Sequence, residues 1–245
     1  MNKINKFEKK IHSQNGEDGI LEFIFSLIGT TNKSFIEFGF ATRNECNTAY
    51  LAIKKGWNGI LIDANSEGIK KSKKFFKKNM GKNFNKIKIL NYMINCENIN
   101  KIFLDHRTSF QIDLLSIDID GNDYWIWKEI SSINPRVVVI EYNAHLGKEK
   151  ALTVNYDPQF NVLEKHWSRC YFGASLNALE KLGKSKGYYL VGCDSKGVNA
   201  FFIRNDLKHK EIEEKTSIEC WNPPMYKYSK KGLSEMLKEM TFVEV

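Results

Sequence analysis

Short apolar segments alternate with helix-like segments along the first 141 residues, and this alternation constrains the fold more than any other feature. The apolar segments are typical of β-strands and cover residues 34–39, 59–63, 86–90, 114–118 and 136–141. Helical periodicity covers residues 19–28, 48–55, 66–79 and 124–131. Ser13 and Asn15, which are typical N-cap residues, precede the first helical segment. Alternating strands and helices form right-handed βαβ units, so we predict an α/β fold with a parallel sheet between two layers of helices.

The pattern changes after Glu141. About 30 residues without clear periodicity precede a helix expected near residues 175–185. Two further apolar segments, 187–191 and 199–203, flank a turn-like stretch at 194–197. This short spacing predicts an antiparallel hairpin. We find no internal repeat and no low-complexity linker, so we expect a single domain over residues 1–245.

Composition narrows the class of protein. Hydrophobic residues make up 42% of the chain and aromatic residues 13%, which is enough for a buried core. The net charge of +8 could attract nucleic acid, an anionic membrane or phosphorylated metabolites. We see no apolar run long enough to span a membrane and no secretory signal, so we expect a cytoplasmic protein. The five cysteines are widely separated, which argues against a disulfide framework or a zinc ribbon.

The residues at the ends of the predicted strands carry the functional signal. Four of the five apolar segments end in a carboxylate, at Glu37, Asp63, Asp118 and Glu141. In an open parallel sheet, ligands bind beyond the carboxyl ends of the strands. We therefore expect these acids to gather in one pocket.

Gly39 and Asp63 indicate a nucleoside-containing cofactor. Gly39 would let the backbone approach a ligand closely, and Asp63 lies 24 residues later, at a spacing typical of an acid that binds ribose hydroxyls. The full G-x-G-x-x-G pattern for a pyrophosphate is absent, which argues against NAD or FAD. S-adenosylmethionine, which carries no phosphate, fits better. The alternative is an ordinary βα turn with a solvated aspartate.

A second set of oxygen-bearing residues predicts a divalent metal site. Asp118 with Asp120, and Glu141 with Asn143, are spaced i and i+2, so each pair would face one way if the strands extend that far. Carboxylate and amide oxygens are the ligands that Mg²⁺ and Mn²⁺ prefer. The alternative is that these acids cap helices or pair with lysines.

The polar, glycine-bearing residues 12–19 precede the first helical segment. Gln14, Glu17 and Asp18 could close over the cofactor. The alternative is an N-capping turn.

Several of these motifs together resemble the FkbM-like family of S-adenosylmethionine-dependent methyltransferases. They are S-Q-N-G-E-D-G-I, F-I-E-F-G, I-D-A-N, S-I-D-I-D-G-N-D-Y and N-A-F-F-I-R, within residues 12–205, which leaves 206–245 as a C-terminal extension. The resemblance implies a Rossmann-like class I methyltransferase fold, with a mostly parallel seven-stranded sheet, a C-terminal antiparallel hairpin and helices on both faces. The cofactor contacts that we predict are Gln14, Glu17, Asp18, Glu37, Gly39, Asp63, Ala64, Cys96 and Asp118.

The segment 118–124 also resembles the metal-binding D-x-D-K-x-x-Y region of catechol-type and caffeoyl-type O-methyltransferases. Asp118 falls on the metal aspartate of those enzymes, and Glu141 and Asn143 fall near their second metal pair. Gly121 stands where those enzymes carry a catalytic lysine, and Arg43 stands where many FkbM-like chains carry a third glycine.

Methyl transfer to a hydroxyl requires a group that removes its proton. Without the lysine, we predict His145 as the base, with Asp120 or His166 behind it. Four aromatic residues could stack on a sugar face or simply pack in the core: Trp125, Trp167, Tyr171 and Phe172.

The resemblance implies an O-methyltransferase that acts on a sugar hydroxyl, of a nucleotide-linked sugar or of a surface (capsular) polysaccharide precursor. A divalent metal, Mg²⁺ or Mn²⁺, would assist it. A nucleic-acid methyltransferase or RNA-binding protein is the alternative suggested by the positive charge, although we find no appended recognition module and expect no specific nucleic acid. A non-catalytic adenosyl-nucleotide binding module is a third hypothesis, and the sequence leaves a homo-oligomer open.

Overall fold

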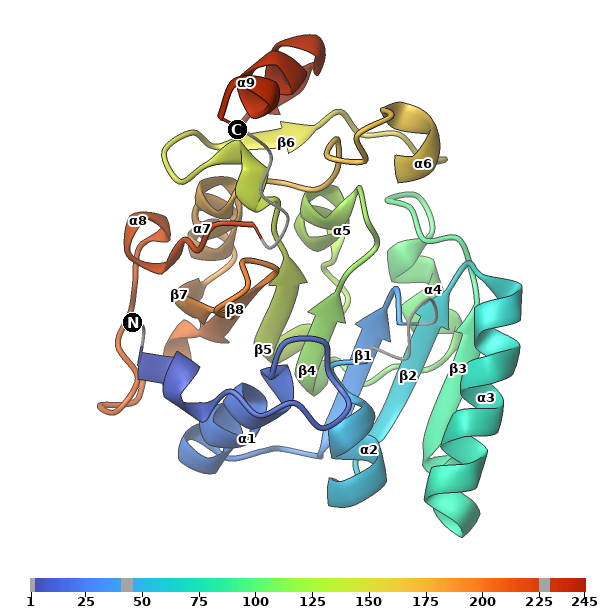
Figure 1. The fold of residues 1–245 in the computed structure, drawn as a ribbon. Coiled ribbons are helices and arrows are strands. Elements are labelled where there is room, and N and C mark those ends of the chain that lie inside the picture. Colours follow the sequence, from blue (N-terminus) through green and yellow to red (C-terminus); the bar gives the residue numbers. More distant parts are fainter. Residues whose placement is uncertain (1–2, 41–45, 225–229) are drawn as a thin grey trace.

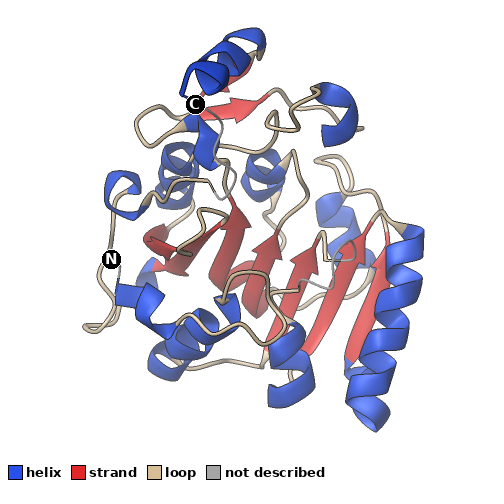
Figure 2. Ribbon diagram, in the orientation of Figure 1, coloured by secondary structure: helices blue, strands red, loops and turns tan. Residues whose placement is uncertain are grey.

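Seven strands form the central sheet of the computed structural model, which describes residues 3–40, 46–224 and 230–245 (Figures 1 and 2). Their order across the sheet is β3-β2-β1-β4-β5-β8-β7. The strands are β1 (Ser34–Phe38), β2 (Asn58–Asp63), β3 (Ile87–Asn91), β4 (Gln111–Ile117), β5 (Asn134–Glu141), β7 (Tyr188–Cys193) and β8 (Asn199–Arg204). Neighbours among β1–β5 are parallel, whereas β8 is antiparallel to both β5 and β7. The predicted parallel sheet with a terminal antiparallel hairpin is confirmed.

Helices cover both faces of this sheet. One face packs against α1 (Glu17–Ile28), α2 (Ala49–Lys55) and α3 (Ser66–Met80), and the other against α4 (Ile99–Asp105), α5 (Asp123–Glu129) and α7 (Leu176–Ser185). Strand residues alternate between the two apolar clusters: Phe35 joins the α1–α3 side, and Ile36 joins the α4–α7 side. This alternation follows from the two-residue period of a strand.

The sequence analysis did not predict several elements, most of which are short. They are β6 (Leu152–Val154), α6 (Val162–Lys165), α8 (Ser217–Cys220), α9 (Lys230–Glu239), β9 (Phe242–Glu244), α4, and the 3-10 turns η1 (Lys3–Phe7), η2 (Gly81–Lys86), η3 (Ala144–Leu146) and η4 (Asn205–Leu207). Most of them are too short for a periodic pattern to stand out. β6 pairs with β9 in a separate two-stranded sheet, although the two strands are far apart in the sequence. Figure 1 shows β6 and α6 on the side to which the carboxyl ends of β1–β5 point.

Several predicted element ends differ from the structure, and the ends of the first helix and of β4 bear on the site. The first helix begins at Glu17, and its N-cap is Gly16 in a left-handed conformation rather than Ser13 or Asn15. Ser13 still contributes, because its Oγ accepts a hydrogen bond from the backbone N–H of Asp18. β4 ends at Ile117, one residue before Asp118.

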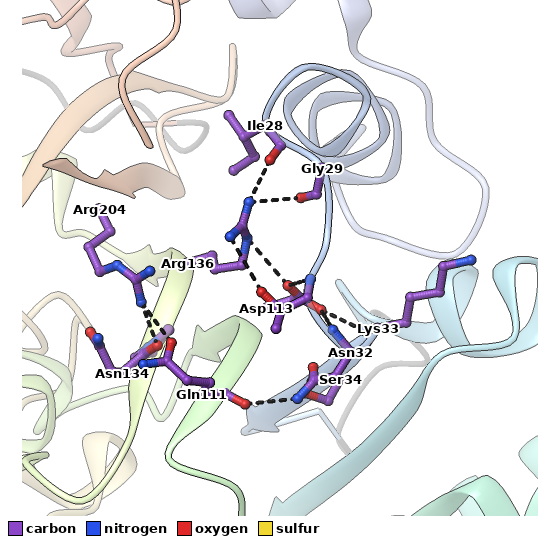
Figure 3. A network of polar contacts seen from close by, with 12 residues as sticks. Ile28, Gly29, Asn32, Lys33, Ser34, Gln111, Asp113, Asn134, Arg136 and Arg204 are labelled. Carbon is purple, nitrogen blue, oxygen red and sulfur yellow. Dashed lines mark hydrogen bonds and ion pairs between the residues drawn. The ribbon is translucent and has the colours of Figure 1, made fainter. Parts of the chain in front are cut away.

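A polar network fastens the amino-terminal end of the sheet (Figure 3). The buried Asp113 of β4 accepts hydrogen bonds at 2.6–3.0 Å from the backbone N–H groups of Thr31, Asn32 and Lys33. Arg136 of β5 lies against Asp113 and donates to the carbonyl oxygens at the end of α1. This network holds the α1–β1 connection at the end of the sheet opposite to the acids predicted for function.

Across the three described segments, no helix combines the length and the apolar character needed to cross a membrane.

Candidate functional site

A cavity of about 700 Å³ opens at the carboxyl ends of the parallel strands. Residues from the tips of β1, β2, β3, β4 and β5 line it, together with Gln14, Asn199 and residues 159–164 around α6. The four predicted strand-tip acids, Glu37, Asp63, Asp118 and Glu141, all line this one cavity. Their convergence is the geometric condition on which the functional prediction depended.

Gly39 lies at the turn after β1. Its φ is +74°, and a Cβ at this position would lie 1.3 Å from the carbonyl oxygen of Asp118. Only glycine fits such a close approach of two backbones in this conformation. Gly39 therefore brings the tip of β1 directly against the tip of β4, whether or not a ligand is present.

Asp63 ends β2 and is 7% exposed. Its Oδ1 accepts a hydrogen bond of 2.7 Å from the N–H of Asn65, which orients the carboxylate. Asn91 Nδ2 donates to the carbonyl oxygens of Asp63 and Ala64, so the turn is tied to the end of β3. Beside Asp63, the partly exposed Tyr92 and Met93 add an apolar wall to the cavity. This side of the cavity combines an oriented acid with apolar surface.

Glu37 has a structural task at the cavity floor. Its carboxylate accepts hydrogen bonds from the backbone N–H groups of Asn47 and Thr48, and also from the Thr48 hydroxyl and the Cys46 thiol. Burial raises the pKa of Glu37 above its ordinary value. We therefore interpret Glu37 as the anchor of residues 46–48, which lead into α2. Arg43, which departs from the family pattern, lies outside the described residues.

The predicted N-terminal contacts divide into two groups. Gln14 lines the cavity, as a cofactor contact would. Glu17 and Asp18 are buried and hold the chain around them: Asp18 Oδ2 accepts three backbone N–H groups between Ile11 and Ser13. Neither Glu17 nor Asp18 is among the described residues that line the cavity. Glu17 and Asp18 thus hold the turn before α1 without capping the helix, whose N-cap Gly16 has no side-chain cap, and the ligand-contact interpretation fits only Gln14.

Asp118, Asp120 and Glu141 form a compact carboxylate cluster. One oxygen of each lies within 4.8 Å of the others, and Asp118 shares a hydrogen bond with Glu141. Glu141 Oε2 is buried and has no hydrogen-bond partner among the described residues. Burial, reinforced by repulsion between neighbouring carboxylates, raises the pKa of both Asp118 and Glu141 well above their ordinary values. Three oxygen donors with an unpartnered buried oxygen fit a hard divalent cation such as Mg²⁺ or Mn²⁺.

The chain brings these acids together by a turn rather than by an extended strand. β4 stops at Ile117, and Asp120 has a φ of +54°. The i and i+2 argument for Asp118 and Asp120 was therefore wrong, although both side chains do reach the cluster. The buried Asp123 shapes the turn by accepting the N–H groups of Ile119 and Gly121, and burial raises the pKa of Asp123 to about 6.

Gly121 occupies the position of the lysine in the related metal-binding motif. A Cβ at Gly121 would lie 2.2 Å from the ring of Phe160, which lines the cavity. Phe160 thus fills the space that a side chain at position 121 would need.

Asn143 does not fit the predicted metal set. Its Nδ2 donates to the carbonyl oxygens of Cys170 and Phe172, both at 2.9 Å, and its Oδ1 accepts the N–H of His145. Each polar atom of this amide is thus already used within the chain. We therefore remove Asn143 from the candidate ligands.

The predicted histidine bases lie elsewhere. His145 is on η3, and His166 contacts Ser168 and Glu239 at the end of α6. Neither is among the described residues that line the cavity, and neither is Cys96. Of the three residues predicted for proton removal, the structure places only Asp120 in the cavity.

The aromatic residues proposed for sugar stacking are also displaced. Trp125 donates to the carbonyl oxygen of Val154 and packs against the core, and Tyr171 packs on Phe242. Trp167 is 74% exposed and, like Phe172, is not among the described residues lining the cavity. Phe160, which sequence reasoning missed, is the aromatic residue that reaches the site from this segment.

Asn199 was also missed as a site residue. It begins β8, lines the cavity and is 2% exposed. A polar residue at the head of the apolar sequence Asn-Ala-Phe-Phe-Ile was a signal available in the sequence.

Comparisons with known proteins give matches at the level of structure only. No family model matches the chain, and no curated protein matches it. An O-methyltransferase from Bacillus cereus in complex with SAH is 13% identical with a TM-score of 0.47, over 79% of this chain and 82% of that one. A SAM-dependent methyltransferase from Aquifex aeolicus is 10% identical with a TM-score of 0.45, over 82% of this chain and 95% of that one.

A protein from Galdieria sulphuraria, assigned as a sarcosine dimethylglycine methyltransferase, is 12% identical with a TM-score of 0.44 over 69% of this chain. This chain spans 57% of that protein. At such identities the likeness concerns the fold alone. The mostly parallel seven-stranded sheet with its antiparallel β7–β8 hairpin and helices on both faces confirms the architecture that the sequence predicted.

Proposed function

We propose that this protein is an FkbM-like methyltransferase that transfers the methyl group of S-adenosylmethionine to a sugar hydroxyl, on a nucleotide-linked sugar or a surface polysaccharide precursor. One observation carries the proposal: a single cavity is lined by Asp63 and Gly39, after β2 and β1, and by Asp118, Asp120 and Glu141 at the ends of the adjoining strands β4 and β5. The first side suits an adenosyl group, and the second suits an alcohol that must lose a proton.

On the cofactor side, we assign Asp63 to the ribose hydroxyls, because its carboxylate is already oriented by Asn65. Tyr92 and Met93 offer apolar surface for the adenine ring. Gly39 and Gln14 line the part of the cavity that would receive the amino-acid tail. These residues bind and position the methyl donor.

On the acceptor side, the hydroxyl oxygen forms a bond to the methyl carbon while the bond from that carbon to sulfur breaks, in line. We assign Asp120, the most exposed acid of the cluster, as the group that takes the hydroxyl proton. Asp118 and Glu141 would hold a divalent cation. When bound, this cation would lower the pKa of the hydroxyl and fix its position.

The acidic acceptor side also argues against the nucleic-acid alternative. Three carboxylates lie where the reacting hydroxyl must sit, and these side chains offer no positive charge to a phosphodiester backbone. Among the described residues that line the cavity there is no Lys or Arg, so the positive net charge of the chain is not concentrated there.

The test is transfer of a labelled methyl group from S-adenosylmethionine to a panel of sugar nucleotides, with Mg²⁺, with Mn²⁺ or with EDTA. We expect a methylated sugar in the presence of metal and a loss of product in EDTA. Product formation that is unchanged in EDTA would remove the metal from the proposal. Failure to bind S-adenosylmethionine would contradict the proposed function itself.

A further inference from the structure

Asn199 lines the cavity and carries a buried polar atom without a hydrogen-bond partner among the described residues. This atom is Oδ1, and the side chain that bears it is 98% buried by the surrounding chain. A buried acceptor without a partner is costly, so such an atom calls for an explanation.

The orientation of the Asn199 amide is fixed. Asn199 Nδ2 donates a hydrogen bond of 2.8 Å to Oε1 of Glu17, which is fully buried and whose Oε2 accepts the N–H of Asn15 at 2.7 Å. Glu17 Oε1 also accepts a hydrogen bond of 3.4 Å from Asn15 Nδ2, so a flipped Asn199 amide would set two acceptors against each other. Oδ1 is therefore the atom left for a ligand. Glu17, which the function above does not use, acts here by setting this orientation.

The backbone places Asn199 beside the carboxylate cluster. In the antiparallel pairing of β5 and β8, Asn199 is the register partner of Glu141, and directly opposed residues point to the same face of a sheet. Asn199 therefore stands beside Glu141 on the acceptor side of the cavity, and strands β1, β4 and β5 separate β8 from β2, which carries Asp63.

The polar groups on this side are hydrogen-bond acceptors. Asp118, Asp120 and Glu141 contribute carboxylate oxygens, two of which share a hydrogen bond, and Asn199 contributes Oδ1. A ligand that binds against them must bring donors or positive charge. A polyol does so with neighbouring hydroxyl groups, whereas a carbonyl or a phosphate does not.

We propose that Asn199 Oδ1 accepts a hydrogen bond from a second hydroxyl of the acceptor, next to the one that is methylated, so that the enzyme selects a diol. This inference rests on the proposed function and deepens it. Asn199 is a specificity-determining residue, and Glu17 is its positioning residue.

The experiment is a binding titration of the full chain with S-adenosylhomocysteine, and then of the saturated protein with UDP-glucose, UDP-galactose and GDP-mannose. We expect at least one sugar nucleotide to bind the wild type, and Asn199→Leu to weaken that binding at least tenfold. The affinity for S-adenosylhomocysteine should stay within twofold. The matched control is Gln159→Leu, an amide lost from the α6 side of the same cavity, for which we expect less than a threefold change.

The outcomes separate the two proposals. If S-adenosylhomocysteine does not bind, the proposed function fails. If it binds, and either no sugar nucleotide binds or Asn199→Leu binds sugar as well as the wild type does, the role of Asn199 is overturned. Should Asn199→Leu fail to fold, deoxy analogues of the bound sugar replace it: removal of one hydroxyl besides the methylated one should weaken wild-type binding tenfold, and equal binding of all analogues would overturn the inference.

Discussion

At the scale of single residues, the carboxylate cluster brings oxygens of three acids within 4.8 Å of one another. Asp118 and Glu141 share a hydrogen bond, and their raised pKa values show that burial disfavours two full charges there. A cation or a shared proton must compensate. Glu141 and Asp63 lie at the ends of different strands, so the role of Glu141 can be tested without altering the adenosyl side.

We predict that Glu141→Gln lowers methyl transfer by about 100-fold, because it removes an oxygen ligand of the cation. The affinity for S-adenosylhomocysteine should change by less than about threefold, since Asp63 lies on the other side of the cavity. Transfer rates and titration calorimetry measure the two effects. Glu164→Gln makes the same chemical change in the same cavity outside the cluster and should leave transfer nearly unchanged. Equal losses in both variants would contradict a specific role for Glu141.

Gly39 gives a second prediction at this scale. Gly39→Ala should lower the free energy of unfolding by about 3 kcal/mol or more, because its Cβ would overlap the Asp118 carbonyl oxygen. Gly56→Ala is the matched control: its φ is +70° in the ordinary left-handed helical region, and the nearest atom to the added Cβ, Lys86 Nζ, lies at 3.6 Å. The control should cost only about 1 kcal/mol. Urea unfolding measures both, and similar losses would show that the contact with Asp118 does not matter.

Asp194 makes the stability depend on pH. It is buried before β8, and burial together with the nearby Glu17 raises the pKa of Asp194 to about 7. The folded protein therefore holds this proton more tightly than the unfolded chain, whose aspartates titrate near roughly 4. The resulting stabilisation is complete below that value and is lost as the pH rises towards 7.

We predict that the free energy of unfolding of the wild type, minus that of Asp194→Asn, falls between pH 4 and pH 7. Asparagine does not titrate, so the difference isolates Asp194. Urea unfolding at four or five pH values measures it. A difference that stays constant or rises over this range would refute the assignment.

At the scale of elements, the sheet separates stability from chemistry. The Asp113 network fastens the amino ends of β4 and β5 to the end of α1, whereas the cavity lies at the opposite ends of the strands (Figure 3). Changes in the network should therefore affect unfolding and leave ligand binding intact.

We predict that Asp113→Ala lowers the free energy of unfolding by about 3–5 kcal/mol, since it strips the acceptor from three backbone N–H groups and leaves Arg136 without its carboxylate. The dissociation constant of S-adenosylhomocysteine should stay within twofold. Asn32→Ala, which removes an exposed amide of the same network, should cost about 1 kcal/mol or less. A large loss of affinity in Asp113→Ala would show that the two ends of the sheet are coupled.

The elements that the sequence predicted are those with a recognisable pattern of apolar residues within their own segment. The strands of the parallel sheet are short apolar runs that are buried almost continuously, because helices cover both faces of the sheet. β6 and β9 are three residues each and depend on pairing between distant segments, and α6 is a single turn. No local pattern predicts such elements, so the segment around Phe160, which walls the cavity, was described as irregular.

At the scale of the whole molecule, the candidate site was predictable in part. The strand-tip rule found Asp63, Asp118 and Glu141 because parallel strands all end at one edge. It failed for Asn143 and His145, which were chosen for their closeness in sequence to Glu141, since the chain turns away from the cavity after β5. Asn199 could not be assigned in this way, because its orientation depends on Glu17, 182 residues earlier in the chain.

The central claim is that one cavity holds an adenosyl ligand and a divalent cation side by side. The most direct measurement is the NMR spectrum of S-adenosylhomocysteine bound to the protein as Mn²⁺ is added. The account predicts strong paramagnetic broadening of the ligand resonances, abolished in Glu141→Gln while the ligand still binds. Sharp ligand resonances with both Mn²⁺ and ligand bound would place the two in separate sites and contradict the account.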